Sequence, residues 1–162
     1  MGSETTAAAA GKVGVLRRDP MAMLPFCGYN MGNYFRHWTN IGRMASRPPL
    51  IFAMNAFRQD DQGGFLWPGF GENIRILKWI IDRVNGRADA RETPLGLVPD
   101  PATFPTDGLN VPRTDLQKLF DVRPGEWGEE LQEIRAFLDR FGQHLPYEIR
   151  RDFEKMAAGL KN

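Results

Sequence analysis

The segment from Gly63 to Asn73, GGFLWPGFGEN, constrains the fold of this chain more than any other stretch. Its glycines and its proline are typical of turns, and three large aromatic residues, Phe65, Trp67 and Phe70, stand between them. The apolar run IRILKWIIDRV follows directly. The sequence therefore predicts a rigid aromatic turn that leads into a helix.

A second turn precedes this one. Residues 58–64, RQDDQGG, are polar and end in two glycines, and they lie between Phe57 and Phe65. Glycine adopts positive φ without strain, which suits a tight hairpin. We therefore expect the rings of Phe57 and Phe65 to lie close together in space.

The helix after the aromatic turn has a narrow polar stripe. We expect it to start at Gly71 and to end with an Asn85-Gly86 cap. Because one stripe is polar and the rest apolar, we expect the helix to be mostly buried. The stripe consists of Arg75, Lys78 and Asp82, and the opposite face of Ile74, Leu77, Ile81 and Val84.

The rest of the chain shows weaker patterns and no internal repeat. Spacing predicts a short helix at 33–41, and the apolar run 50–54 has the length of a buried strand. Residues 87–112 are irregular, with TPLGLVP extended. Apolar residues then recur every three or four positions from Trp127 to Phe141 and from Ile149 to Leu160, which predicts two helices packed as a hairpin.

Length and charge limit the class of protein. A chain of 162 residues is one domain by size, and its net charge of +1 provides no basic field for nucleic acid. No stretch has the apolar length of a membrane span, and the first residues lack a hydrophobic leader. Cys27 is the single cysteine. We expect a cytoplasmic protein that binds neither nucleic acid nor membrane.

Most catalytic constellations are missing. His37 and His144 are far apart in sequence, and neither has further ligands at metal-binding spacing. Cys27 has no histidine motif beside it, and Asp60-Asp61 lies in a polar turn where a solvated role is expected. AGKV at 10–13 lacks the glycine spacing and the Ser or Thr of a phosphate loop. The sequence predicts no catalytic residue and no metal ligand in this chain.

The aromatic residues remain as candidates for binding. The rings of Phe57, Phe65 and Phe70 could stack on a nucleobase, but stacking tolerates every base. Base selectivity requires hydrogen bonds at the ring edge, which free N–H groups at a helix start and the Asn73 side chain could provide. Such donors favour the keto oxygen of guanine. The alternative is that the three phenylalanines simply fill a core.

Three stretches carry a resemblance to a known family: DPMAMLPFCGYNMG, NAFRQDDQGGFLWPGFGENIRILKWI and RETPLGLVP. They closely resemble the C-terminal part of GTP-dependent phosphoenolpyruvate carboxykinase. The resemblance implies part of a lyase of gluconeogenesis that decarboxylates oxaloacetate and uses GTP to form phosphoenolpyruvate, GDP and carbon dioxide. It also implies Mn²⁺ and Mg²⁺ in the complete enzyme, and guanine nucleotide and oxaloacetate or phosphoenolpyruvate as ligands.

The resemblance also implies a fold and site residues. The expected fold class is α/β, with residues 1–162 as the C-terminal portion of a nucleotide-binding domain, locally mostly helical with a few short strands. Residues 2–14 would be a mobile lid, 50–85 the guanine pocket and its helix, and 113–160 the C-terminal helices. The nucleotide-binding residues would be Phe57, Phe65, Phe70, Gly71, Glu72 and Asn73. The lid would include Ser3, Glu4, Thr5, Thr6, Ala7, Ala8, Ala9, Ala10, Gly11 and Lys12.

Composition by itself favours a frayed terminus at 2–14, so the lid rests on the resemblance. Ala56 stands where the family commonly has Trp, and the resemblance covers only about the last quarter of the family's chain, beyond its metal and phosphate motifs. We therefore expect a fragment that is inactive alone. The alternatives are a non-catalytic purine-binding module and a helical interaction protein that docks through residues 127–160.

Overall fold

The structure is a computed structural model that describes residues 2–4, 16–18 and 23–161. The chain divides into two compact units. One combines Met1–Pro48 with Pro124–Asn162, and the other is Pro49–Arg123. Each unit has its own buried side chains, so each is described by itself.

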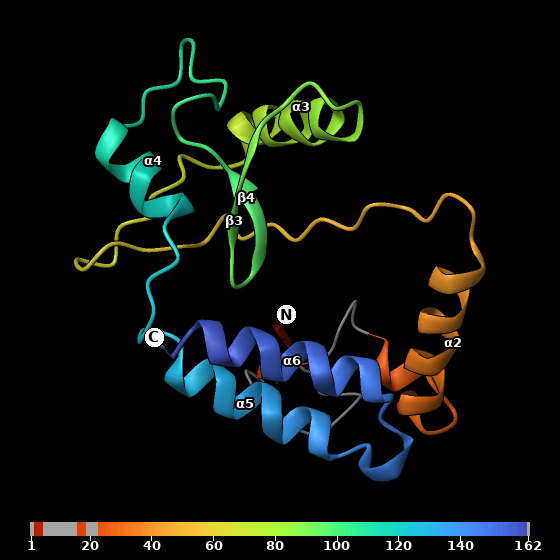
Figure 1. Cartoon of the computed structure of the whole chain (residues 1–162). Coiled ribbons are helices and arrows are strands. Elements are labelled where there is room, and N and C mark those ends of the chain that lie inside the picture. The colour runs from red at the N-terminus through yellow and green to blue at the C-terminus, as the bar shows by residue number, and fades with distance from the viewer. Residues whose placement is uncertain (1, 5–15, 19–22, 162) are drawn as a thin grey trace. The chain divides into compact units, whose positions relative to one another are not determined.

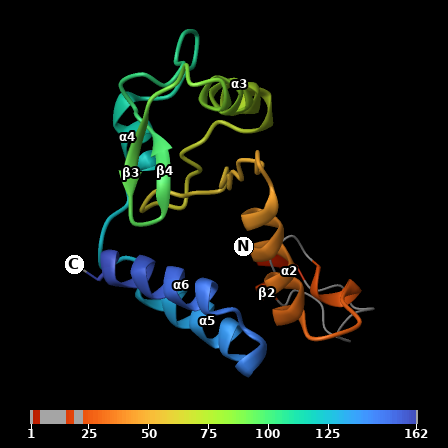
Figure 2. The same ribbon diagram turned by 45° about the vertical axis from the view of Figure 1, so that its right-hand side comes forward.

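The first unit is built from helices and one small sheet (Figures 1 and 2). Its two strands pair antiparallel, with Gly2 opposite Arg18 and Glu4 opposite Leu16. The elements are β1 (Gly2–Glu4), β2 (Leu16–Arg18), the 3₁₀ turn η2 (Leu24–Phe26), α2 (Met31–Met44), α5 (Gly128–Asp139), the 3₁₀ turn η4 (Gly142–His144) and α6 (Tyr147–Gly159).

Helix α2 contains the helix expected at 33–41 and extends it at both ends. It begins after Asn30, whose Oδ1 accepts a hydrogen bond from the N–H of Gly32 at 2.8 Å and so caps the first turn. Its buried face includes Phe35, whose ring meets that of Phe141 edge-to-face at 5.3 Å. This contact joins α2 to the C-terminal helices.

Helices α5 and α6 lie side by side, as the spacing of their apolar residues predicts (Figures 1 and 2). The chain breaks between them at η4, and α6 starts directly after Pro146. The guanidinium of Arg135 in α5 lies 5.1 Å from the centre of the Phe153 ring in α6. The buried apolar residues of the pair are Leu131, Phe137, Leu138, Phe141, Leu145, Phe153, Ala157 and Leu160.

The second unit packs around two tryptophans. Its buried cluster is Trp67, Trp79, Phe104 and Leu116. The elements are the 3₁₀ turn η3 (Phe70–Glu72), α3 (Asn73–Val84), β3 (Ala90–Thr93), β4 (Gly96–Pro99) and α4 (Arg113–Phe120). Strands β3 and β4 form an antiparallel hairpin, so the TPLGLVP segment is partly extended, as expected.

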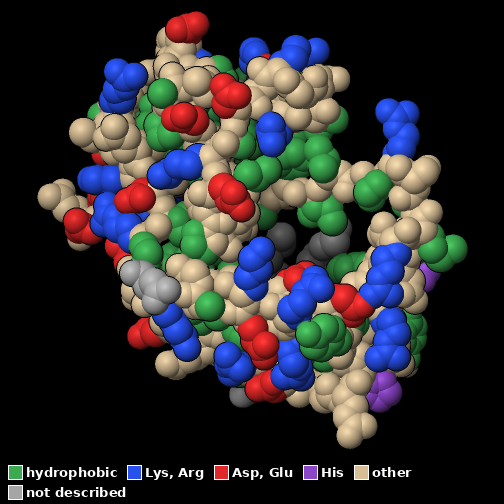
Figure 3. Space-filling view, viewed as in Figure 1, with side chains coloured by type: hydrophobic (Ala, Val, Ile, Leu, Met, Phe, Trp, Pro, Cys, Tyr) green, Lys and Arg blue, Asp and Glu red, His purple; other side chains and the backbone are tan. Residues whose placement is uncertain are grey.

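Two expectations for this unit are wrong. Residues 50–54 form no strand, and Ile51 is 92% exposed. Helix α3 is not mostly buried, because the unit's core covers only the face that carries Trp79. The apolar residues of the opposite face reach the surface, and Figure 3 shows hydrophobic side chains there beside lysines and arginines. They are Ile74, Leu77, Ile81 and Val84.

About half of the described residues are therefore helical, and the strands among them form two small antiparallel sheets. In the described segments, no helix combines the length and the apolar character needed to cross a bilayer. Asn85 and Gly86 end α3 as the sequence predicts, since Gly86 has a φ of 69°. Within the aromatic segment 57–73, this arrangement leaves the side chains of Phe57, Phe65 and Phe70 exposed and that of Trp67 buried.

Candidate nucleotide-binding site

The chain reverses direction between Phe57 and Phe65, as the polar turn predicts. The N–H of Leu66 donates to the carbonyl of Arg58 at 3.0 Å, and Gln59 pairs with Phe65 in an antiparallel bridge. Gly63 has a φ of 80°, which a residue with a side chain rarely adopts. The turn thus places the rings of Phe57 and Phe65 6.1 Å apart, nearly perpendicular to each other.

Asp60 organises this turn. Its Oδ1 accepts hydrogen bonds from the N–H groups of Gln62 at 2.9 Å and Gly64 at 2.8 Å. Its own backbone also pairs with Gly64, whose carbonyl accepts from the Asp60 N–H at 2.8 Å. The half-buried Asp60 side chain is therefore structural, whereas the sequence predicts only a solvated role.

Arg58 ties the turn to the end of α4. Its Nη1 donates to the carbonyl of Asp121 at 2.7 Å and to that of Leu119 at 3.4 Å. A hydrogen bond from Arg123 lowers the pKa of the Asp121 carboxyl, and the nearby charges of Arg91 and Arg58 lower it further. The hairpin is thus held to the unit by a charged side chain that binds backbone carbonyls.

The three phenylalanines face solvent and do not fill the core. Phe57 is 77% exposed, Phe65 61% and Phe70 90%. Within the described part of the chain, the Phe70 ring contacts neither of the other two. Exposed aromatic rings clustered on one segment are typical of a binding surface. The core-filling alternative is therefore wrong for these residues, while Trp67 is buried as a packing residue.

The segment from Gly69 to Asn73 forms a tight 3₁₀ turn. Gly69 has a φ of 116°, and the N–H groups of Glu72 and Asn73 donate to the carbonyls of Gly69 and Phe70. In the described residues, no acceptor pairs with the N–H groups of Phe70 and Gly71. The free donors expected at the helix start are therefore those of the preceding turn.

Two side chains of this turn already have partners. The Nε1–H of Trp67 donates to Oδ1 of Asn73 at 2.8 Å. Oε2 of Glu72 accepts from Nε of Arg75 at 2.5 Å, so the charge of this carboxylate is compensated. A bound anion would meet less repulsion from Glu72 than from a free carboxylate.

The structure describes only part of the expected lid. Ser3 and Glu4 belong to β1, and their partners in β2 are Arg17 and Leu16. This pairing brings together the two chain ends that bracket residues 5–15. The remaining expected lid residues, Thr5 to Lys12, lie outside the described residues.

Known proteins resemble the chain over nearly its whole length. The family model described as phosphoenolpyruvate carboxykinase C-terminal P-loop domain matches residues 1–159. This chain belongs to the GTP-dependent phosphoenolpyruvate carboxykinase family. Over 162 residues, 99% of this chain, it is 47% identical to "Phosphoenolpyruvate carboxykinase [GTP]" of Paenarthrobacter aurescens. It is 48% identical over 95% of its length to the protein of that name from Thermoplasma volcanium. It is 49% identical over 90% of its length to the one from Anaeromyxobacter dehalogenans.

This carboxykinase-family chain spans about a quarter of those relatives. It covers 27% of the Paenarthrobacter protein, 26% of the Thermoplasma protein and 24% of the Anaeromyxobacter protein. In the described residues, no three His, Cys, Asp or Glu side chains gather as a metal site. His144 instead pairs with Oδ1 of Asn33 at 3.0 Å, and the Cys27 thiol donates to the carbonyl of Tyr29.

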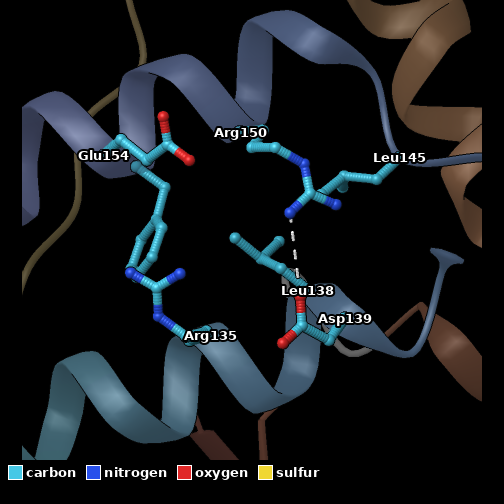
Figure 4. Close-up of a pocket in the computed structure, with 7 residues that line it drawn as sticks. Arg135, Leu138, Asp139, Leu145, Arg150 and Glu154 are labelled. Atoms are coloured by element: carbon cyan, nitrogen blue, oxygen red, sulfur yellow. Dashed lines mark ion pairs between the residues drawn. The ribbon is translucent and has the colours of Figure 1, made fainter. Parts of the chain in front are cut away.

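The carboxykinase-family chain also has two hollows along α5 and α6. The first has a volume of about 10 Å³, enough for a water molecule, and Arg150 spans it toward Asp139 with 3.8 Å between Nη1 and Oδ1 (Figure 4). The second, of about 300 Å³, has a mainly apolar lining that includes Leu131 and Phe153. Neither hollow is lined by a residue of the aromatic segment 57–73.

The sequence did not predict the hydrogen bonds that Asp60 and Trp67 make in this candidate site. Asp60 could have been found from its position in a DDQGG turn, because an Asp side chain commonly bonds the N–H two residues later. The bond between Trp67 and Asn73 has no such local signal, since it depends on how Pro68 and Gly69 turn the chain.

Proposed function

We propose that this chain provides the guanine-binding surface and the lid of a GTP-dependent phosphoenolpyruvate carboxykinase. In that reaction, oxaloacetate loses carbon dioxide and the enolate oxygen receives the γ-phosphoryl group of GTP, which gives phosphoenolpyruvate and GDP. The observation that carries the proposal is the exposure of Phe57, Phe65 and Phe70. In the described residues, the N–H groups of Phe70 and Gly71 are also left without an acceptor. Family membership supports it.

Each part of the site would have a distinct task. The rings of Phe57, Phe65 and Phe70 would stack on the base, which contributes about 1–3 kcal/mol per base. The N–H groups of Phe70 and Gly71 and the amide of Asn73 would donate to acceptors on its edge. Because Glu72 is paired with Arg75, its negative charge would repel the phosphates of the nucleotide less than a free carboxylate would.

We also propose that the chain is the C-terminal portion of an α/β nucleotide-binding domain. Residues 2–14 would act as a lid, of which residues 2–4 pair as β1 with residues 16–18 of β2. A closed lid would exclude water from the reactive enolate. The complete enzyme would use Mn²⁺ and Mg²⁺. Among the described residues, no group of His, Cys, Asp and Glu side chains would hold them, so we assign no metal-dependent step to these residues.

The direct test is a titration of the 162-residue chain with GTP, followed by NMR of the aromatic side chains. We expect GTP to shift the resonances of Phe57, Phe65 and Phe70. Phe70→Ala should weaken binding about 5- to 150-fold, the equivalent of one stacking contact. Phe26→Ala is the matched control, because Phe26 is 88% exposed and lies in the other unit. Equal effects of the two substitutions would contradict the proposal.

A hybrid enzyme separates catalysis from mere binding. This chain would replace the matching 27% of the Paenarthrobacter aurescens protein, and GTP-dependent formation of phosphoenolpyruvate would be measured. We expect an active hybrid that loses activity when Phe70 becomes Ala. A folded hybrid that binds GTP without turnover would instead favour a non-catalytic purine-binding module.

A further inference from the structure

The Asn73 amide has an orientation that its neighbour determines. The Nε1–H of Trp67 lies 2.8 Å from the Asn73 side chain and can only donate a hydrogen bond. Its partner must therefore be the amide oxygen, Oδ1. The amide nitrogen, Nδ2, is consequently the end left for other partners, and no acceptor in the described segments occupies it.

Trp67 is itself held rigidly. It is only 4% exposed, and its ring packs against Phe104 at 6.3 Å in the core of the unit that also contains Trp79 and Leu116. Asn73 is half-buried at the first position of α3. The core therefore determines the direction of the indole N–H before any ligand arrives.

We propose that Trp67 is a positioning residue that determines which purines the site accepts. It would hold Asn73 so that the two N–H bonds of Nδ2 face the base. These donors match the O6 acceptor of a 6-oxo purine. In a 6-amino purine the same position carries an amino group, so that two donors would face each other. Without the indole N–H, the amide can rotate by half a turn and offer its oxygen instead. This inference rests on the proposal that the segment 57–73 binds a nucleobase.

The test compares ITP with ATP, which differ in the base at C6 and N1. Both are titrated into the full chain, and the ratio of their dissociation constants is measured by NMR. We expect the chain to prefer ITP, and Trp67→Phe to reduce this preference about 3- to 10-fold, the value of one net hydrogen bond. In Trp67→Phe, the affinity for ITP should fall by a smaller factor than the ratio of the two dissociation constants changes.

Trp79→Phe is the matched control. Trp79 is 6% exposed, belongs to the same core cluster, and its Nε1–H donates to the carbonyl of Asp89 at 3.3 Å. This substitution removes the same group from the same core without touching Asn73. We expect it to lower the melting temperature as Trp67→Phe does and to leave the ITP-to-ATP ratio unchanged.

Asn73→Asp keeps the argument testable if Trp67→Phe does not fold. An aspartate still accepts from Trp67 but presents an oxygen outward, so the ratio should move toward ATP. An unchanged ratio in either variant, or equal changes in Trp67→Phe and Trp79→Phe, overturns the inference. Binding of GTP and ITP without preference over ATP overturns it while the proposed function stands. No binding of any purine nucleotide overturns both.

Discussion

Replacing Asp60 should make the hairpin between Phe57 and Phe65 open more often, without unfolding the second unit. In Asp60→Ala, the N–H groups of Gln62 and Gly64 lose the carboxylate oxygen that accepts from both at 2.8–2.9 Å. A half-exposed bond of this kind contributes about 0.5–1.5 kcal/mol, so the two together contribute roughly 1–3 kcal/mol. Opening of the hairpin should therefore become about 5- to 150-fold more frequent.

The assay is hydrogen exchange of the amides that close the hairpin. The N–H of Leu66 donates to Arg58 at 3.0 Å, and the backbone N–H of residue 60 donates to Gly64 at 2.8 Å. In Asp60→Ala, both amides should exchange about 5- to 150-fold faster, while the exchange rates of amides in α3 stay unchanged. The contact between the rings of Phe57 and Phe65 should weaken in parallel, and with it the GTP binding that we propose for this segment.

Two variants control this experiment. Asp61→Ala removes the same carboxylate from the next position, where the side chain is exposed and makes no bond in the part of the chain that the structure describes. It should leave the exchange rates unchanged. Asp60→Asn retains an oxygen at the bonding position and should recover most of the protection. Equal loss of protection in Asp60→Ala and Asp61→Ala would refute the reasoning.

Two further predictions concern packing and charge. A Cβ at Gly32 would lie 2.7 Å from the backbone of His144, so Gly32→Ala should lower the free energy of unfolding by about 1–3 kcal/mol. Gly42 has open space around it, so Gly42→Ala should raise the free energy of unfolding by roughly 0.5–1 kcal/mol. Urea titration measures both changes. The Asp82 carboxyl should titrate below its ordinary pKa of 3.8, because Lys78 donates a hydrogen bond to it at 2.5 Å, and Lys78→Ala should raise this pKa in a carboxyl ¹³C titration. Since the folded-state pKa is lowered, the stabilisation is present above pH 3.8 and is lost as the pH falls through the folded value.

Local features of the site could be predicted from the sequence. The hairpin that joins Phe57 and Phe65 follows from the polar turn with its two glycines, of which Gly63 has the positive φ that a tight turn needs. The helices α5 and α6 follow from the spacing of their apolar residues. These properties depend on residues within a few positions of one another.

Burial could not be predicted in the same way. The pattern of α3 shows that the helix is apolar on most sides, but not how many sides find a partner. In the structure only the face around Trp79 meets the core, and Ile74 and Ile81 stay exposed. The same holds for 50–54, an apolar run of strand length that pairs with no strand among the described residues.

The sequence by itself determined the family and the hairpin between Phe57 and Phe65, because each is encoded in short contiguous motifs. It predicted a helix start at Gly71, whereas α3 begins at Asn73, directly after the 3₁₀ turn Phe70–Glu72. Only the tertiary structure decided that the three phenylalanines face solvent and that Trp67 holds the amide of Asn73. Exposure and amide orientation depend on which distant residues fill the core. Here Phe104 and Leu116 pack with Trp67 in the core, whereas Phe65 and Phe70 on either side of it in the sequence are exposed.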